Sequence, residues 1–119
     1  MSGGRPDTSA GNVEELTVRE AFARLSETEA APLLVDVRET WEYLDGHAQG
    51  AISLPLSTFR ERFVELPRDR DLLFICHLGQ RSMVAAKFMY KQGITRVFNV
   101  EGGTDSWEAA KLPMEHGAV

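Results

Sequence analysis

Two short apolar runs set the main limit on how this chain can fold. Residues 33–37 and 72–75 consist almost entirely of aliphatic and aromatic side chains and lack the alternation of a half-exposed strand. This pattern is typical of central strands in a parallel sheet, because helices cover both faces of such a sheet. The chain must therefore supply helices between its strands.

Strand-like and helix-like segments do alternate along the chain. Thr17 and Glu20 have the spacing of a capping box, and apolar residues then recur with helical spacing up to Leu25. The expected strands cover 13–16, 33–37, 50–55, 72–75 and 96–100, and the expected helices cover 18–25, 39–45, 56–66, 83–92 and a short segment around Trp107. This order predicts an α/β fold with a mostly parallel sheet of four or five strands and helices on both faces.

The length of 119 residues is enough for one domain with its own core. We expect a flexible tail over 1–12, a folded domain over 13–113 and a second tail over 114–119. No apolar run approaches the ~18–20 residues of a membrane span, and the chain start lacks the apolar region of a signal peptide, which favours a cytoplasmic protein without a membrane partner. A net charge of −5 argues against a nucleic-acid partner.

The chain's single cysteine stands where the second apolar run ends. Cys76 is followed by a short loop and then by helix-like residues from Met83. Loop amides and a helix N-terminus together favour an anion and activate a nearby thiol, so this position suits a nucleophile. A buried cysteine that serves only as a small hydrophobic residue is the alternative. One cysteine also excludes an internal disulfide and a Cys-x-x-Cys motif.

A carboxylate interrupts the first apolar run. Asp36 must be hydrogen-bonded or paired if that strand is buried, and Arg38 lies on the same side of an extended chain. The carboxyl ends of strands are where open α/β sheets bind ligands. We therefore expect Arg38 and the Gly102-Gly103 turn to lie near Cys76.

Three motifs, in order along residues 36–107, resemble those of the rhodanese family of sulfurtransferases. The first comprises Asp36-Val37-Arg38, Glu42-Tyr43, Gly46-His47, Gly50-Ala51 and Leu54-Pro55; the second comprises Cys76, Gly79 and Arg81; the third comprises Gly102, Gly103 and Trp107. One such motif alone is weak, but three in register are specific.

This resemblance implies a rhodanese-like three-layer α/β/α fold with a five-stranded sheet. It also implies a cycle in which the Cys76 thiolate attacks the sulfane sulfur of thiosulfate or a similar donor and becomes a persulfide. The persulfide then passes its sulfur to cyanide or a thiol, and a sulfur-accepting protein is a further candidate partner. Neither a metal nor an organic cofactor is implied.

The same resemblance suggests roles for individual residues. Cys76 is the expected nucleophile, and the expected backbone donors to the persulfide are His77, Leu78, Gly79, Gln80, Arg81 and Ser82. The Arg81 side chain is the expected anion binder, with Arg38 as a second candidate. The expected structural support comes from Asp36, Glu42, His47, Gly102, Gly103 and Trp107. Ser82 also suits a helix cap, and His77 suits either a role at the rim or plain solvent exposure.

Two other classes of function compete with this interpretation. A phosphatase or arsenate reductase would resemble a Cys-x5-Arg loop, whereas only four residues separate Cys76 from Arg81, which suits a single sulfur atom. A thiol-relay reductase would also need a second cysteine. A non-catalytic binding module is the other alternative, although such domains often lose the cysteine that this chain keeps.

Overall fold

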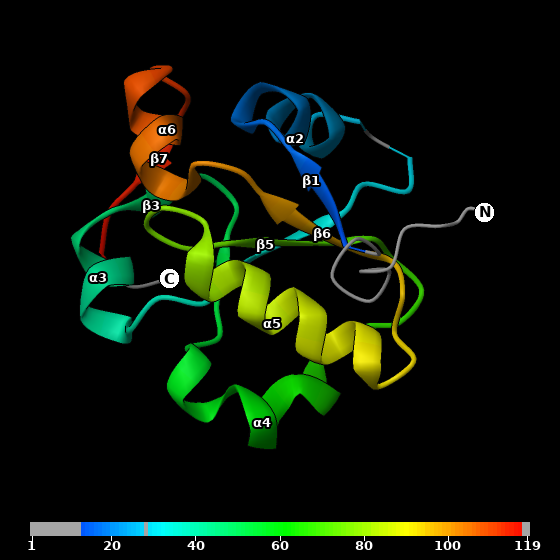
Figure 1. The fold of residues 1–119 in the computed structure, drawn as a ribbon. Coiled ribbons are helices and arrows are strands. Elements are labelled where there is room, and N and C mark those ends of the chain that lie inside the picture. The colour runs from blue at the N-terminus through cyan, green and yellow to red at the C-terminus, as the bar shows by residue number, and fades with distance from the viewer. Residues whose placement is uncertain (1–12, 28, 118–119) are drawn as a thin grey trace.

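The computed structural model describes residues 13–27 and 29–117, so the tail expected over 1–12 lies outside the described residues. A five-stranded parallel sheet with the order β1-β6-β5-β2-β4 forms its centre (Figure 1). The strands are β1 (Glu14–Leu16), β2 (Leu33–Asp36), β4 (Ile52–Ser53), β5 (Leu72–Ile75) and β6 (Val97–Val100). The predicted α/β class and parallel sheet are confirmed.

The two apolar runs form the adjacent central strands β2 and β5. Leu33 lies opposite Leu72 in the parallel register, and every residue of β5 is buried. Because successive side chains of a strand point to opposite faces, Leu73 packs on one side of the sheet and Phe74 on the other. Two apolar clusters therefore form, one on each face.

Helices cover both faces and complete three layers (Figure 1). α2 (Val18–Leu25) and α6 (Gly103–Ala109) cover one face, where Trp107 packs edge-on against Phe22 with ring centroids 6.0 Å apart. α4 (Phe59–Arg62) and α5 (Gln80–Lys91) cover the other face, where Phe59 packs edge-on against Phe74 of β5. No helix within the described ranges is long and apolar enough to cross a membrane.

The capping box expected before the first helix is present. The Glu20 N–H donates to Thr17 Oγ1 at 3.1 Å, and the Thr17 N–H donates to Glu20 Oε1 at 2.8 Å. These bonds satisfy two of the amide groups that a helix N-terminus leaves without an intrahelical partner.

Two helices differ from their expected bounds. α5 begins at Gln80, three residues before the expected Met83, because Gly79 takes a left-handed conformation (φ 111°) and turns the loop directly into the helix. The helix expected over 56–66 is divided into η1 (Leu56–Thr58), α4 and η2 (Phe63–Glu65). It breaks at Thr58, whose φ of −119° lies outside the helical range, and after Arg62, whose φ of −111° distorts the last turn of α4.

A two-stranded antiparallel ribbon is present where a C-terminal tail was expected. β7 (Met114–Glu115) pairs with β3 (His47–Ala48), although 114–119 was expected to be a tail and no strand was expected at 47–48. Trp107 fixes this return of the chain, because its Nε1–H donates to the Pro113 carbonyl at 2.7 Å. Two-residue strands carry too little periodicity to be detected in sequence.

The short helix α3 (Thr40–Asp45) is anchored by one buried tyrosine. The Tyr43 hydroxyl donates to the Ala51 carbonyl at 2.6 Å, and burial raises the pKa of this phenol. Its ring stacks on His47 with a centroid separation of 3.7 Å. The position of α3 relative to the sheet therefore depends on Tyr43.

Substituting Tyr43→Phe should lower the free energy of unfolding by about 1–2 kcal/mol, because the buried Ala51 carbonyl loses its donor. Tyr90→Phe is the matched control, since Tyr90 is a partly buried tyrosine at the hydrophobic cluster beneath α5. That control should stay within about 0.5 kcal/mol of the parent protein. Urea denaturation measures both, and equal losses in the two variants would contradict the anchoring role.

Candidate active site

Three segments that follow neighbouring strands meet at the carboxyl edge of the sheet. Cys76 follows β5, Arg38 follows β2 and Gly102-Gly103 follows β6. The Thr104 N–H lies 2.8 Å from the Cys76 carbonyl oxygen, so the third segment touches the cysteine directly. The expected proximity of the Gly102-Gly103 turn to Cys76 is present in the structure.

Two donors point at the buried Cys76 sulfur. The Gly79 N–H lies 3.1 Å from Sγ, and the Ser82 hydroxyl lies 3.3 Å from it. Within the loop 76–82, Gly79 is the one amide that makes a hydrogen bond to Sγ. Ser82 is fully buried in the first turn of α5, whose N-terminus faces the sulfur with partial positive charge. The Cys76 sulfur therefore faces hydrogen-bond donors of its own loop and helix.

The N-terminus of α6 binds the backbone of the cysteine loop. The Thr104 and Asp105 N–H groups donate to the carbonyls of Cys76 and His77 at 2.8 and 3.1 Å, and Thr104 Oγ1 adds a bond to the first carbonyl. Gly103 (φ 60°) lies so close that a Cβ atom there would collide with both carbonyl oxygens. These contacts fix the positions of the two carbonyls.

Asn99 is a supporting residue that the sequence analysis missed. It is buried in β6, and its Nδ2 donates to the Gly79 carbonyl at 3.2 Å and to Glu15 Oε2 at 2.8 Å. The bond to the Gly79 carbonyl helps to hold Gly79 in the conformation in which its N–H points at Cys76. The available signal was a polar residue inside an otherwise apolar strand, the same signal that identified Asp36.

Arg38 and Asp36 form a closed ion pair. Arg38 Nε and Nη2 donate to the Asp36 carboxylate at 2.8–3.1 Å, and Nη2 also donates to the Gly46 carbonyl at 2.7 Å. Only 6% of Arg38 is exposed. The pair therefore ties the end of β2 to the start of the segment that carries β3.

Arg81 is also paired with a carboxylate. Its Nη1 and Nη2 lie 2.9 and 3.0 Å from Glu42 Oε1 and Oε2, which is a bidentate arrangement. Hydrogen bonding to Arg81 is the main cause that lowers the pKa of Glu42 from 4.5 to about 2, against the opposing effect of burial. The same bond raises the pKa of Arg81.

The remaining expected support residues lie around this centre. His47 is buried, with Nδ1 2.8 Å from the Tyr43 carbonyl and Nε2 3.5 Å from Glu115 Oε1. Gly102 (φ 80°) caps α6 in the left-handed conformation that glycine tolerates. His77 and Leu78 are exposed at the rim of the loop.

A cavity of about 250 Å³ opens beside the cysteine loop. Its lining residues are Arg38, Trp41, Glu42, Asp45, Gly46, His77, Thr104 and Glu108. Trp41 is an exposed aromatic residue, and three of the lining side chains are carboxylates. Among residues 13–27 and 29–117, no group of three or more histidine, cysteine, aspartate or glutamate side chains is placed to hold a metal ion.

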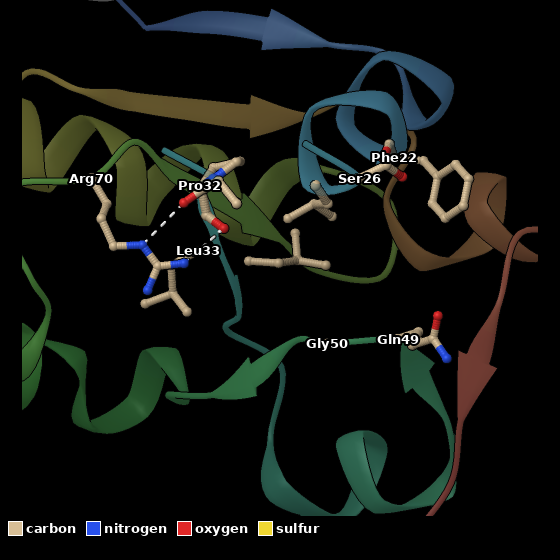
Figure 2. Close-up of a pocket in the computed structure, with 10 residues that line it drawn as sticks. Phe22, Ser26, Pro32, Leu33, Gln49, Gly50 and Arg70 are labelled. Atoms are coloured by element: carbon tan, nitrogen blue, oxygen red, sulfur yellow. Dashed lines mark hydrogen bonds between the residues drawn. The ribbon is translucent and has the colours of Figure 1, made fainter. Parts of the chain in front are cut away.

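A larger cavity, of about 440 Å³, lies away from the cysteine. It is lined by Leu33 and Leu34 at the start of β2, by Gln49 and Gly50 before β4, and by residues of α2 (Figure 2). Arg70 borders it and donates to the carbonyls of Ala31 and Pro32. This cavity belongs to the amino ends of the strands, opposite the edge that carries Cys76.

Fold and site together define a three-layer α/β protein whose cysteine lies in an anion-stabilising loop. Residues 17–110 match the family of rhodanese-like domains, and the chain belongs to that family. It is 36% identical to a sulfurtransferase of Allochromatium vinosum, over 86% of this chain and 94% of that protein. It is 34% identical to the thiosulfate sulfurtransferase GlpE of Actinobacillus pleuropneumoniae, over 85% and 92%.

A solved structure agrees with this assignment. The crystal structure of a rhodanese-related protein from Thermoplasma volcanium superposes with a TM-score of 0.78 at 29% identity, and the match covers 86% of this chain and 97% of that one. The family resemblance and the rhodanese-like fold inferred from the sequence motifs are thus confirmed.

Substituting Gly103→Ala should destabilise the protein and loosen the cysteine loop, because the new Cβ meets the carbonyls of Cys76 and His77. Gly93→Ala is the matched control, since Gly93 also has a positive φ (86°) but nothing lies within 4 Å of its Cβ position. The control should lose about 1–2 kcal/mol from backbone strain, and Gly103→Ala about 1–3 kcal/mol more.

Hydrogen–deuterium exchange locates the effect of these two variants. Peptides that cover residues 76–82 should exchange faster in Gly103→Ala than in the control. Equal exchange of this loop in both variants would show that α6 does not hold it.

Proposed function

We propose that this protein is a sulfurtransferase that works through a persulfide on Cys76. The Cys76 thiolate attacks the outer sulfur of thiosulfate or a similar sulfane donor, the S–S bond of the donor breaks, and sulfite leaves with the bonding electron pair. The resulting persulfide anion then gives its outer sulfur to cyanide or to a thiolate, and Cys76 returns to its initial state. One sulfur atom enters and one leaves, without net oxidation of the protein.

The observation that carries this proposal is the convergence of donors on Cys76 Sγ. The Gly79 amide, the Ser82 hydroxyl and the N-terminus of the twelve-residue helix α5 all face the sulfur. Such donors stabilise the thiolate before the reaction and the persulfide anion after it. The other loop amides, from His77, Leu78, Gln80 and Arg81, are proposed to reach the outer sulfur once it is added.

The two arginines differ in accessibility, and their proposed roles differ accordingly. Arg81 is the proposed binder of the donor's anionic group, because its side chain is 38% exposed. Arg38 is the weaker candidate, because it is buried and bonded to Asp36 and Gly46. We assign Arg38, Asp36, His47, Gly102, Gly103 and Trp107 to the support of the site.

The competing functions fit the chain less well. Four residues separate Cys76 from Arg81, one fewer than in the Cys-x5-Arg loop of phosphatases, which suits a ring around one sulfur rather than around a tetrahedral oxyanion. A reductase that forms an internal disulfide needs a second cysteine, and the sequence has one. The retained cysteine and its donors argue against a purely non-catalytic binding module.

Incubation with thiosulfate should add about one sulfur atom to the intact protein, because the persulfide accumulates when no acceptor is present. Intact-protein mass spectrometry measures the gain, and a thiol reductant should remove it. Cys76→Ser is the matched control and should neither gain the mass nor release thiocyanate from thiosulfate and cyanide. Turnover by this variant equal to that of the parent would refute the mechanism.

Substituting Arg81→Ala should raise the KM for thiosulfate about tenfold with a smaller fall in kcat, because a charge-assisted contact to the donor is lost. Arg62→Ala is the control, since Arg62 forms a similar bidentate ion pair with Glu65 on α4 and η2, but neither residue belongs to the cysteine loop and neither lines the cavity. Thiocyanate formation at varied thiosulfate concentration gives both constants. An unchanged KM in Arg81→Ala would move anion binding to another residue.

A further inference from the structure

Glu42 is already bonded to the Arg81 guanidinium, which is the group that the proposed sulfur donor needs. Both outer nitrogens of Arg81 bond to the two oxygens of the Glu42 carboxylate, so the end of the guanidinium is occupied and its charge is balanced. A donor anion that binds Arg81 must either replace one of these bonds or use the remaining N–H groups beside the Glu42 charge.

Glu42 is the fixed member of this pair. Its Oε1 also accepts the Glu39 N–H at 2.9 Å, as part of the capping box at the start of α3. The side chain of Glu42 is 17% exposed, against 38% for Arg81. Movement that opens the pair is therefore expected from Arg81, whose long side chain lies nearer the solvent.

Neutral or mildly acidic pH does not open the pair. The pKa of Glu42 is lowered to about 2, mainly by its hydrogen bonds to Arg81. The carboxylate therefore stays ionised from about pH 4 upward. Protonation of Glu42 therefore does not release Arg81 under ordinary conditions.

The surrounding charges do not offer a second anion site. Arg38, the guanidinium in the cavity wall, is bonded to Asp36 and to the Gly46 carbonyl. Asp45 and Glu108 add two carboxylates to the same wall. A doubly charged donor thus meets one neutralised guanidinium and a wall with excess negative charge, which opposes its approach.

We propose that Glu42 determines which sulfur donors this site accepts, by competing with the donor's anionic group for Arg81. The Glu42 charge repels a doubly charged donor such as thiosulfate about twice as strongly as a singly charged one at the same position. This inference rests on the proposed function and deepens it: the favoured donors are sulfane compounds with a single negative charge, such as organic thiosulfonates or persulfides.

The reaction with such a donor balances in the same way as that with thiosulfate. The Cys76 thiolate attacks the terminal sulfur of an alkanethiosulfonate, the S–S bond breaks, and the sulfinate anion leaves with the electron pair. The two starting anions give two product anions, the persulfide and the sulfinate. With thiosulfate the leaving group is sulfite, and the donor brings one additional negative charge.

Substituting Glu42→Gln tests the competition. Glutamine keeps the length of the side chain and an oxygen that can accept the Glu39 N–H, but it removes the charge that holds Arg81. The KM for thiosulfate should fall about three- to tenfold, the range expected when a part-exposed charged partner is lost. The KM for methanethiosulfonate should fall by less than about twofold, so the preference for the singly charged donor should shrink.

Two controls separate the pair from a general charge effect. Glu65→Gln removes the carboxylate of the Arg62–Glu65 pair, outside the cavity, and should leave both KM values unchanged. The double variant Glu42→Gln/Arg81→Ala should show the high KM of Arg81→Ala alone, because no guanidinium remains to be released. Glu108→Gln should change the KM for thiosulfate less than Glu42→Gln does.

The outcomes distinguish this inference from the proposed function. If the parent protein forms the persulfide but Glu42→Gln raises the KM for both donors, or leaves their ratio unchanged, Glu42 only supports the loop and the inference is overturned. Thermal unfolding of each variant confirms that the compared proteins are folded. If no protein with an intact Cys76 forms a persulfide from either donor, the proposed function itself fails.

Discussion

The close approach of α6 to the backbone of the cysteine loop is the contact on which this site depends. Gly103 lets the helix start directly against the Cys76 and His77 carbonyls, and the Thr104 and Asp105 amides bind them. The Gly79 amide, the Ser82 hydroxyl and the start of α5 face the sulfur. The polarity around Cys76 is therefore produced by backbone groups together with one hydroxyl, which the ends of β5 and β6 position.

Side-chain charge acts at a second level, where both arginines of the site are paired with carboxylates. Asp36 holds Arg38 inside the protein, whereas Glu42, which lines the cavity, holds the part-exposed Arg81. The first pair is buried, so separating its members costs several kcal/mol and it serves as scaffold. The second is part-exposed and can exchange partners at lower cost. Two arginines that look equivalent in sequence thus differ in accessibility, because one is buried and the other is part-exposed.

Local patterns predicted the parts of this structure that depend on neighbouring residues. The apolar runs identified β2 and β5, Thr17 and Glu20 identified the start of α2, and the loop around Cys76 identified the centre of the site. Contacts between distant segments were not predictable in the same way. The Glu42–Arg81 pair, the bond from Asn99 to Gly79 and the pairing of β3 with β7 join residues that no periodicity relates.

The return of the chain through β7 has a consequence for anything attached after it. His116 Nδ1 lies 2.8 Å from the carbonyl of Asp45, a residue that lines the cavity beside the cysteine, and the Gly117 N–H donates to the Leu44 carbonyl. A polypeptide fused beyond these residues would thus start close to the mouth of the site. A short flexible linker would then hold a tethered thiol there at an effective concentration in the millimolar range, on the order expected for such linkers.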